Sequence, residues 1–314
     1  MGCWMTQSVA MVFPGQGSQK VGMAHALGDD PQGRWDIAST MLGYSLKTVC
    51  LEGPEATLMQ THYAQPAIFV VSVVLWDRLQ REGIQPTYVA GHSLGEITAY
   101  FAAGVLSFED ALRLIQVRGT AMAAATQPGT TGMAAVVGLT SEAVIESLES
   151  VSDHGVVVAN YNAPNQTVIS GPISGIDQLV SVIKERGGKL IRLPVSGAFH
   201  SPMMRPAQTV LSEWVSTVPW HSAQVPVVLN RTGQPEHRLD QLRDNLPLQV
   251  VSEVKWVDTV RWLATSVDQV IEVGPGSVLA GLCKKTVPDW AVSSIDSEAS
   301  ALAWIQGHIK GVVS

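Results

Sequence analysis

The sequence predicts an α/β fold in which a largely parallel sheet carries a small inserted domain. Segments typical of strands and of helices alternate along most of the 314 residues, as they do in parallel sheets whose strands are joined by helices. One internal stretch instead follows the order β-α-β-β-α-β, which is the ferredoxin-like arrangement. Together these observations indicate a large α/β domain interrupted by a smaller one.

Three strands are predicted in the large domain, each ending in a glycine-rich turn. They are Val9–Phe13, Tyr88–Ala90 and Gln269–Val273. A helix should follow the turn after the second strand and reach Ala103, and another should begin near Ser277. The apolar stretch Ala67–Trp76 is far shorter than the roughly 20 residues that a membrane helix needs, so we expect a buried helix there.

The insert is predicted to begin after Pro128-Gly129-Thr130-Thr131-Gly132, which breaks the preceding helix. Its expected elements are, in order, a strand (Met133–Val137), a helix (Ser141–Leu148), two strands (Val156–Asn160 and Thr167–Ser170), a helix (Ile176–Arg186) and a strand (Lys189–Leu193). We therefore expect a small domain at residues 129–195 within a large domain formed by residues 1–128 and 196–314. The cleft between two such parts is where ligand sites tend to lie.

The composition excludes several classes of protein. With 46% hydrophobic and 15% charged residues, the chain is expected to form a large hydrophobic core and not to be disordered. Its formal net charge of -7 predicts no nucleic-acid partner. The three cysteines (Cys3, Cys50 and Cys283) are far apart and form neither a metal motif nor a disulfide framework, which fits a reducing cytoplasm. We expect a cytoplasmic protein with no membrane partner, and nothing in the sequence demands more than a monomer.

The pentapeptide Gly91-His92-Ser93-Leu94-Gly95 has the G-x-S-x-G form of a nucleophile elbow. In such an elbow the serine lies on a tight strand-to-helix turn, and small neighbours allow the backbone to bend. The predicted strand before it and helix after it supply that context. Ser93 is therefore the candidate nucleophile, and the N–H of Leu94 can face the oxyanion formed in acyl transfer.

Eight histidines compete for the role of the base that such a serine needs. His200 is the best placed, because it follows the insert where the chain rejoins the large domain at the predicted cleft. A structural loop histidine is the alternative that the residues leave open. His92 adjoins Ser93 and should point away from the turn. The others lie in segments expected to be surface helix, turn or polar loop: His25, His62, His154, His221, His237 and His308.

Arg118 lies on the apolar face of a predicted helix. That helix begins at Ser107 with Asp110 three residues on, which resembles a capping box. The apolar stripe that Arg118 shares consists of Ala111, Leu114, Ile115 and Met122. A guanidinium that points inward must find an anion, and its planar fork suits a carboxylate. A buried structural ion pair and a side chain that reaches outward to solvent are the alternatives.

The segment Gly15-Gln16-Gly17-Ser18-Gln19 follows the first predicted strand. It resembles a phosphate-binding loop but lacks the spacing and the lysine of that motif. Its place at a strand end suggests a tight loop beside Ser93, where the N–H of Gln16 could complete an oxyanion hole. Alone, the segment predicts no more than a turn.

With these residues identified, the sequence resembles the malonyl-CoA:acyl-carrier-protein transacylases, including the trans-acting acyltransferases of polyketide assembly. The resemblance covers nearly the whole chain. Five motifs in the same order carry it: Phe13-Pro14-Gly15-Gln16-Gly17-Ser18-Gln19, Gly91-His92-Ser93-Leu94-Gly95-Glu96, Arg118-Gly119, Gly197-Ala198-Phe199-His200-Ser201 and Glu272-Val273-Gly274-Pro275-Gly276.

The resemblance implies a hydrolase-like large domain and a Ser93–His200 dyad. It also implies that Gln16 and Leu94 donate to the oxyanion, that Arg118 holds the malonyl carboxylate, and that the bulk of Phe199 disfavours a branched acyl group. Malonyl-CoA and an acyl carrier protein would be the substrates, with no metal or other cofactor.

The resemblance further implies that a backbone carbonyl, at Lys255, orients the histidine. Glu253 departs from the pattern there, because the family commonly has proline at that position. Gln249 matches a glutamine that the family places near its site.

A serine thioesterase or hydrolase on the same scaffold is the main alternative, with Asp110, Asp153 or Asp177 as the third member of a triad. A binding protein on an inactive enzyme fold is a further alternative, which the intact Ser93 and His200 disfavour. The sequence leaves fatty acid and polyketide biosynthesis both open. Candidate basic contacts for an acidic carrier protein are Lys284 with Lys285, and Lys189 with Arg192, although all four can equally be ordinary solvated side chains.

Overall fold

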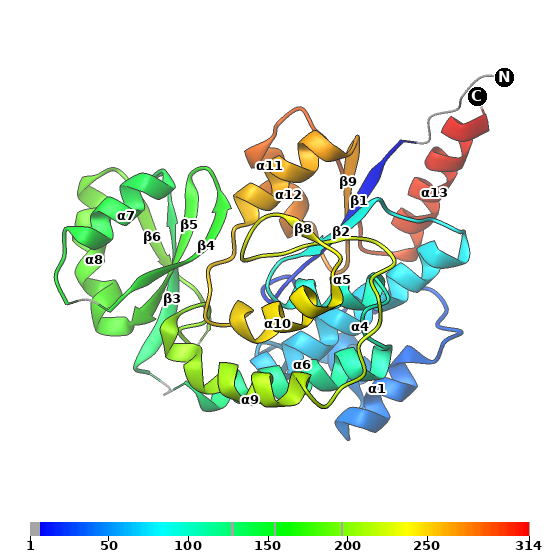
Figure 1. Ribbon diagram of the computed structural model, residues 1–314, viewed down its shortest axis with the longest axis horizontal. Coiled ribbons are helices and arrows are strands. Elements are labelled where there is room, and N and C mark those ends of the chain that lie inside the picture. The colour runs from blue at the N-terminus through cyan, green and yellow to red at the C-terminus, as the bar shows by residue number, and fades with distance from the viewer. Residues whose placement is uncertain (1–6, 127–128, 154, 196, 314) are drawn as a thin grey trace.

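A computed structural model describes residues 7–126, 129–153, 155–195 and 197–313, with side chains through residue 308. Cys3, His154 and the predicted domain-boundary residues 128 and 196 lie outside the described residues. The described chain forms two sheets, one in each of two parts that lie next to each other (Figure 1).

The first sheet belongs to the larger part and has the strand order β10-β9-β1-β2-β7-β8. Its strands are β1 (Val9–Phe13), β2 (Tyr88–Gly91), β7 (Val227–Val228), β8 (Pro235–Glu236), β9 (Gln269–Val273) and β10 (Ala291–Ile295). Neighbouring strands are parallel except for β8, which pairs antiparallel with β7. Parallel strands of this kind need helical connections, and these cover both faces of the sheet.

The larger part holds most of the helices of the described chain. They are α1 (Arg34–Leu42), α2 (Leu46–Glu52), α3 (Glu55–Leu58), α4 (Thr61–Arg81), α5 (Leu94–Ala102), α6 (Phe108–Ala124), α9 (Arg205–Val215), α10 (Leu239–Gln249), α11 (Trp256–Ser266), α12 (Val278–Thr286) and α13 (Glu298–Val313), with a short 3-10 helix at Pro202–Met204. None of the helices in the described ranges is both long and apolar enough to cross a membrane.

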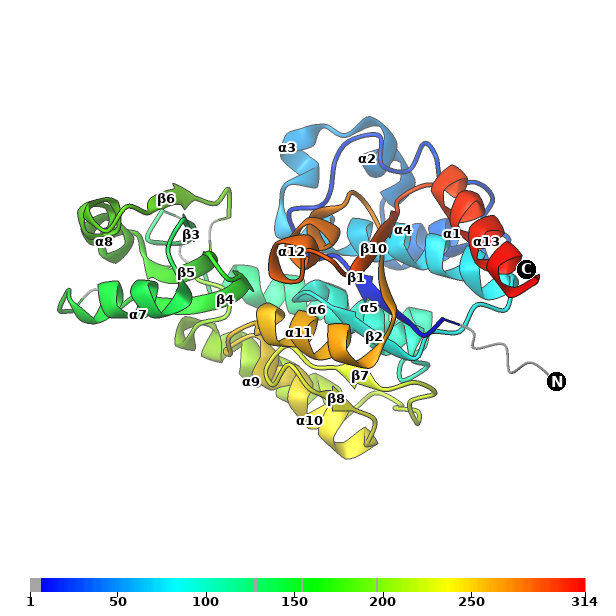
Figure 2. The ribbon, with the colours of Figure 1, turned by 90° about the horizontal axis from the view of Figure 1, so that it is seen from above.

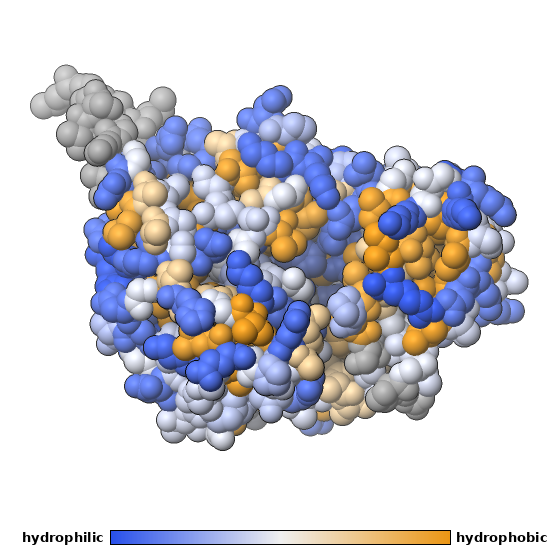
Figure 3. Space-filling view, turned by 180° about the vertical axis from the view of Figure 1, so that it is seen from behind, coloured by the Kyte–Doolittle hydropathy of each residue, from blue (hydrophilic) through white to orange (hydrophobic). Residues whose placement is uncertain are grey.

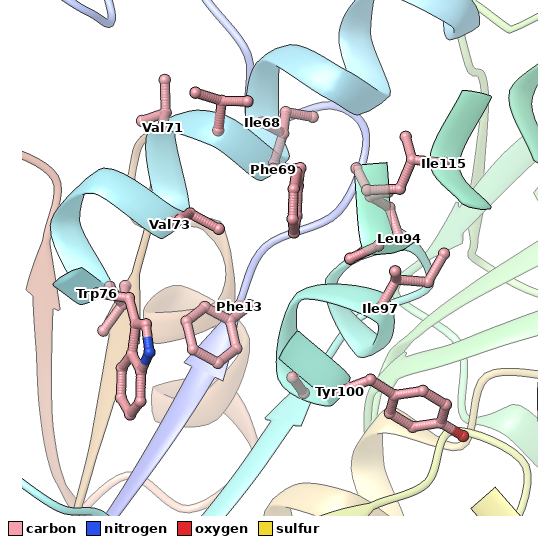
Figure 4. Packing of buried hydrophobic residues seen from close by; sticks show 14 of the residues in the cluster. Phe13, Ile68, Phe69, Val71, Val73, Trp76, Leu94, Ile97, Tyr100 and Ile115 are labelled. Carbon is pink, nitrogen blue, oxygen red and sulfur yellow. The ribbon is translucent and has the colours of Figure 1, made fainter. Parts of the chain in front are cut away.

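Strand β1 is buried on both faces because its alternate side chains enter two different cores. Met11 and Phe13 join the larger core with α4 and α5, whereas Ala10 and Val12 join a second core with α11 and α12. Phe13 meets Trp76 of α4 edge to face, with ring centroids 6.0 Å apart (Figure 4). Figure 2 shows α4 and α11 on opposite sides of β1. Packing on both faces thus fixes β1, and with it the start of the loop that follows Phe13.

The second sheet is antiparallel, with the order β4-β5-β3-β6. The elements of this smaller part are β3 (Thr131–Val137), α7 (Ser141–Glu149), β4 (Val157–Ala163), β5 (Gln166–Pro172), α8 (Ile173–Glu185) and β6 (Lys189–Arg192). Ala134 and Val136 face a core shared with α7 and α8, whereas Met133 and Ala135 pack toward the larger part. The helices therefore cover one face of this sheet and leave the other for the interface.

The face opposite to Figure 1 shows apolar surface gathered on the smaller part (Figure 3). The smaller part exposes Val180 of α8 and Ile191 of the edge strand β6.

The predicted fold class is confirmed, including the β-α-β-β-α-β order of the small sheet. The Ala67–Trp76 stretch is buried within α4. Helix α8 begins at Ile173, three residues before its predicted start, because Pro172 turns the chain directly from β5 into the helix. Strands β7, β8 and β10 were not predicted. The first two have only two residues each, too few for a periodic pattern.

Candidate active site

Ser93 lies at a sharp turn between β2 and α5. Its backbone φ of 54° and ψ of -106° is a conformation that non-glycine residues rarely adopt. A Cβ on Gly91 would lie 2.0 Å from the Gly95 carbonyl, and one on Gly95 would lie 2.0 Å from the Phe13 carbonyl oxygen. The two glycines of the motif are therefore required by close backbone packing, which supports the nucleophile elbow.

His200 forms a hydrogen-bonded pair with Ser93. The Ser93 Oγ lies 2.7 Å from His200 Nε2, and the imidazole is only 4% exposed. On the other side of the ring, Nδ1 lies 3.1 Å from both the Gln249 and Ser252 carbonyl oxygens. Carbonyl oxygens only accept, so Nδ1 carries the proton and Nε2 is free to accept from the Ser93 hydroxyl. The arrangement makes His200 a base for Ser93.

The prediction that Lys255 supplies the orienting carbonyl is wrong. The Lys255 carbonyl instead accepts from the N–H of Thr259 in the first turn of α11. Helix α10 ends at Gln249, and the turn after it places the Gln249 and Ser252 carbonyls against His200; the Gln249 carbonyl also accepts from the Ser252 N–H at 3.2 Å. Glu253 is half-buried, and its carboxylate accepts from the Tyr161 hydroxyl at 3.5 Å.

Burial keeps His200 neutral. Loss of solvation and, next, the nearby Arg118 charge lower the pKa of His200 to about 3. In the resting site the imidazole is therefore unprotonated at neutral pH, as a general base must be.

Arg118 of α6 reaches the same hydroxyl. Its side chain is 1% exposed, and its Nη2 donates to Ser93 Oγ at 3.0 Å and to Gln249 Oε1 at 3.2 Å. Its Nη1 donates to Gln65 Oε1 at 3.0 Å. The Nε is buried and has no hydrogen-bond partner among the described residues.

Burial lowers the pKa of Arg118 to about 10, so the guanidinium is still charged at neutral pH. No described carboxylate forms an ion pair with it within 4 Å. An unneutralised buried cation beside the nucleophile is suited to bind a carboxylate. The alternatives of a structural ion pair and of an outward-reaching side chain do not describe this residue.

A cavity of about 190 Å³ lies between the two parts in front of these groups. The larger part contributes Gln16, Met59, Gln65, Met122 and Phe199 to its wall, and the smaller part contributes Met133, Asn160, Asn162 and Val168. The wall is mainly apolar around one cation and one nucleophile. It fits a short acyl chain that ends in a negative charge.

Gln16 and Leu94 both border this cavity, as the two oxyanion donors should. Within the described part of the chain, neither backbone N–H has a hydrogen-bond partner. The N–H of Ser93 itself is taken, because it donates to Asn230 Oδ1 at 2.7 Å. The Gln16 side chain turns away and donates to Thr61 Oγ1 at 3.3 Å.

Gln249, which the resemblance placed near the site, and the residues Asn230, Glu96 and Asn245, which were not predicted, hydrogen-bond to the backbone or side chains that support the elbow. Gln249 Nε2 donates to the Ser93 carbonyl at 2.9 Å, and Asn230 Nδ2 donates to the Gly91 carbonyl at 2.6 Å. Glu96 is 1% exposed and accepts from the Asn230 N–H and from Asn245 Nδ2. Burial raises the pKa of Glu96 to about 7. Glu96 closes the Gly91–Glu96 motif on which the resemblance rests, but no role was predicted for it.

The remaining sequence candidates lie away from this cluster. Asp110 accepts from the Ser107 hydroxyl at the start of α6, and exposed Asp177 pairs with Arg192. Asp153 is exposed. None of the three is hydrogen-bonded to His200, whose Nδ1 meets carbonyl oxygens instead. The three-membered triad of a hydrolase is thus not formed by these candidates.

The candidate basic residues are exposed but not all free. Lys284 Nζ donates to the Trp290 carbonyl at 2.7 Å, and Lys285 Nζ donates to Gln166 Oε1 of the smaller part at 3.2 Å.

The comparisons with known proteins agree with this geometry. A protein family described as the acyl transferase domain matches residues 10–312. The polyketide biosynthesis protein ThaF of Burkholderia thailandensis is 43% identical over 289 residues, which are 91% of this chain and 25% of ThaF. The chain thus spans about a quarter of ThaF, and 38% of another relative, PksE of Bacillus subtilis.

Other relatives match over nearly their full length. The polyketide biosynthesis malonyl CoA-acyl carrier protein transacylase PksC of Bacillus subtilis is 38% identical over 285 residues, 90% of this chain and 98% of PksC. Among solved structures, the malonyl-transacylase PlMCAT, in complex with the type II polyketide acyl-carrier protein AntF, superposes with a TM-score of 0.92 at 34% identity. That match covers 96% of this chain and 99% of the other.

Proposed function

Because this chain belongs to the acyl transferase domain family, we propose that it transfers a malonyl group from malonyl-CoA to the phosphopantetheine thiol of an acyl carrier protein. The single observation that carries the proposal is Arg118. Its guanidinium is buried, has no carboxylate partner within the described residues, and lies 3.0 Å from the nucleophile oxygen. A carboxylate on the third carbon of the acyl group could meet this cation while Ser93 attacks the thioester.

In the first half-reaction His200 Nε2 takes the proton of Ser93 Oγ as that oxygen attacks the thioester carbon. The carbonyl oxygen becomes an oxyanion, which the N–H groups of Gln16 and Leu94 stabilise. When the tetrahedral intermediate collapses, the carbon–sulfur bond breaks and coenzyme A leaves as a thiol with the proton from His200. The product is a malonyl ester on Ser93.

In the second half-reaction the thiol of the carrier protein gives its proton to His200 and attacks the ester. The same oxyanion hole holds the second intermediate, and Ser93 Oγ recovers the proton as the ester bond breaks. Atoms and charges balance without a metal or redox group, so coenzyme A enters only as the thioester substrate. The expected kinetics are ping-pong, because one substrate leaves before the other reacts.

An acyl carrier protein as partner is supported by the transacylase relatives and by the solved complex of a similar transacylase with its carrier protein. Action as a monomer and residence in the cytoplasm remain part of the proposal. Relatives named for polyketide biosynthesis and relatives named only malonyl CoA-acyl carrier protein transacylase match this chain at similar identity, 38% and 37%.

Intact-protein mass spectrometry after brief exposure to malonyl-CoA, acetyl-CoA or methylmalonyl-CoA tests the proposal. We expect a malonyl adduct on the native chain, its absence in Ser93→Ala, and its release by a carrier protein faster than by water. Hydrolysis that outpaces transfer would instead make the chain a thioesterase. The absence of any adduct would indicate an inactive site.

A further inference from the structure

Asn230 occupies a position that the reaction described above does not use. It follows β7, and the register of the parallel pair β2–β7 sets Val228 opposite Ala90. Two residues beyond that pair, Asn230 lies level with His92 at the carboxyl edge of the sheet. The side chain of Asn230 has no exposed surface. Sheet register alone therefore places a buried amide beside the elbow.

The Asn230 side chain forms hydrogen bonds to the elbow backbone both before and after His92. Its Oδ1 accepts from the Ser93 N–H at 2.7 Å, and its Nδ2 donates to the Gly91 carbonyl at 2.6 Å. The two contacts use both the acceptor and the donor end of one planar amide, against the backbone on either side of His92. They hold the turn in the strained conformation at Ser93.

The backbone of Asn230 is anchored in two further directions. Its N–H donates to the buried Glu96 carboxylate at 2.5 Å, and its carbonyl accepts from the Lys255 N–H at 2.8 Å. Lys255 ends the segment 249–255, whose Gln249 and Ser252 carbonyls orient His200. The Asn230 side chain thus contacts the backbone of the elbow that carries Ser93. Its backbone carbonyl contacts the segment 249–255 that orients His200.

We propose that Asn230 is a positioning residue that holds Ser93 in register with His200 and keeps the Ser93 N–H out of the oxyanion hole. The inference rests on the proposed function for its importance to turnover, but its geometry concerns only the dyad. An amide removed from this position would leave the Ser93 N–H and the Gly91 carbonyl buried without partners, and the elbow would relax.

The test measures the rate at which Ser93 reacts with a fluorophosphonate probe, which needs the elbow and the base but no malonyl group. We expect Asn230→Ala to slow this reaction and kcat by about 100-fold, the order expected for a small misplacement of reacting groups. Malonyl-CoA affinity, measured in a Ser93→Ala background, should be unchanged because Arg118 is not touched. Val260→Ala, a buried apolar truncation in α11, is the control for lost stability and should leave the labelling rate intact.

Asn230→Asp provides a second variant in case Asn230→Ala does not fold. It keeps an acceptor for the Ser93 N–H but can donate to the Gly91 carbonyl only when its carboxyl is protonated. Its labelling rate relative to the native chain should therefore rise as pH falls. Labelling at the native rate by Asn230→Ala, labelling at the native rate by Asn230→Asp at every pH, or a loss no greater than that of Val260→Ala would overturn the proposal. An absent malonyl adduct on the native chain would contradict the proposed function alone.

Discussion

Arg118 Nη2 donates to Ser93 Oγ across 3.0 Å, while His200 Nε2 lies 2.7 Å from the same oxygen. The nucleophile is therefore held between a fixed cation and a neutral base. A cation at this distance favours the alkoxide that forms as the proton leaves. Under the proposed function, the same cation would also bind the carboxylate of the malonyl group. One side chain thus bears on both reactivity and selectivity.

Replacing Arg118 by alanine should change which acyl group the chain accepts. Two charge-assisted hydrogen bonds to the malonyl carboxylate would be lost, so kcat/KM for malonyl-CoA should fall by about 10²- to 10⁴-fold. Acetyl-CoA, which has no carboxylate to leave unpaired, should gain relative to malonyl-CoA. Competition between the two thioesters, followed by mass spectrometry of the Ser93 adduct, measures the ratio. A ratio equal to that of the native chain would show that Arg118 is structural.

The reactivity of Ser93 should be lost only at a lower pH than is usual for a serine with a histidine base. An ordinary histidine loses base activity below about pH 6.5, whereas burial and Arg118 lower the pKa of His200 to about 3. The neutral form therefore persists on the acid side of pH 6.5, and fluorophosphonate labelling should stay nearly constant there. In Arg118→Ala the loss of a positive charge raises the pKa, so the acid limb should move toward higher pH. If the labelling rates of the native chain and of Arg118→Ala fell at the same acid pH, this account would be contradicted.

Gly95→Ala should disrupt the elbow. Its Cβ would lie 2.0 Å from the Phe13 carbonyl oxygen, which is backbone of the central strand and cannot move aside. We expect a large drop in melting temperature together with lost acylation. Gly281→Ala is the matched control, because a Cβ there meets no heavy atom within 4 Å in helix α12, and it should stabilise by about 0.5–1 kcal/mol. Thermal melts of both variants compare the two effects, and equal melting temperatures would refute the packing argument.

The elements carrying motifs could be predicted because their signals are local. Strand β1, strand β9 and the cap of α6 by Ser107 appear where alternation and capping place them. The support of the site could not be predicted in the same way. Asn230 acts on Ser93 from 137 positions away, and its place depends on the pairing of a two-residue strand.

The orientation of His200 shows a different limit. Its partners are backbone carbonyls, and every residue type carries one, so no side-chain pattern marks them. The resemblance led to Lys255, whose carbonyl belongs to the first turn of α11. The acceptors lie at the end of α10 and in the turn that follows it, and the conformation of that turn depends on tertiary packing.

Phe199 should restrict the acyl group by its bulk. Its ring is nearly buried and borders the cavity, and a Cβ on Gly197 would lie 2.3 Å from that ring. Phe199→Ala should therefore raise kcat/KM for methylmalonyl-CoA relative to malonyl-CoA by about 10- to 200-fold. Gly197→Ala should also change this preference, since the ring must shift to make room for the added Cβ. An unchanged preference in both variants would mean that the ring does not contact the substrate.

Charge reversal at Lys285 tests docking of the carrier protein better than charge reversal at Lys284. Lys284 also donates to the Trp290 carbonyl, so its reversal to glutamate should lower the melting temperature as well. Lys285 is exposed and reaches Gln166 across the boundary of the two parts. If an acidic carrier protein docks there, Lys285→Glu should lower kcat/KM for the carrier while malonyl loading from malonyl-CoA stays unchanged, and added salt should reduce the difference. Lys47→Glu on α2 makes the same change of charge at another exposed site. An equal kcat/KM for the carrier protein in the two variants would mean that net charge alone accounts for the effect. The docking surface would then not include Lys285.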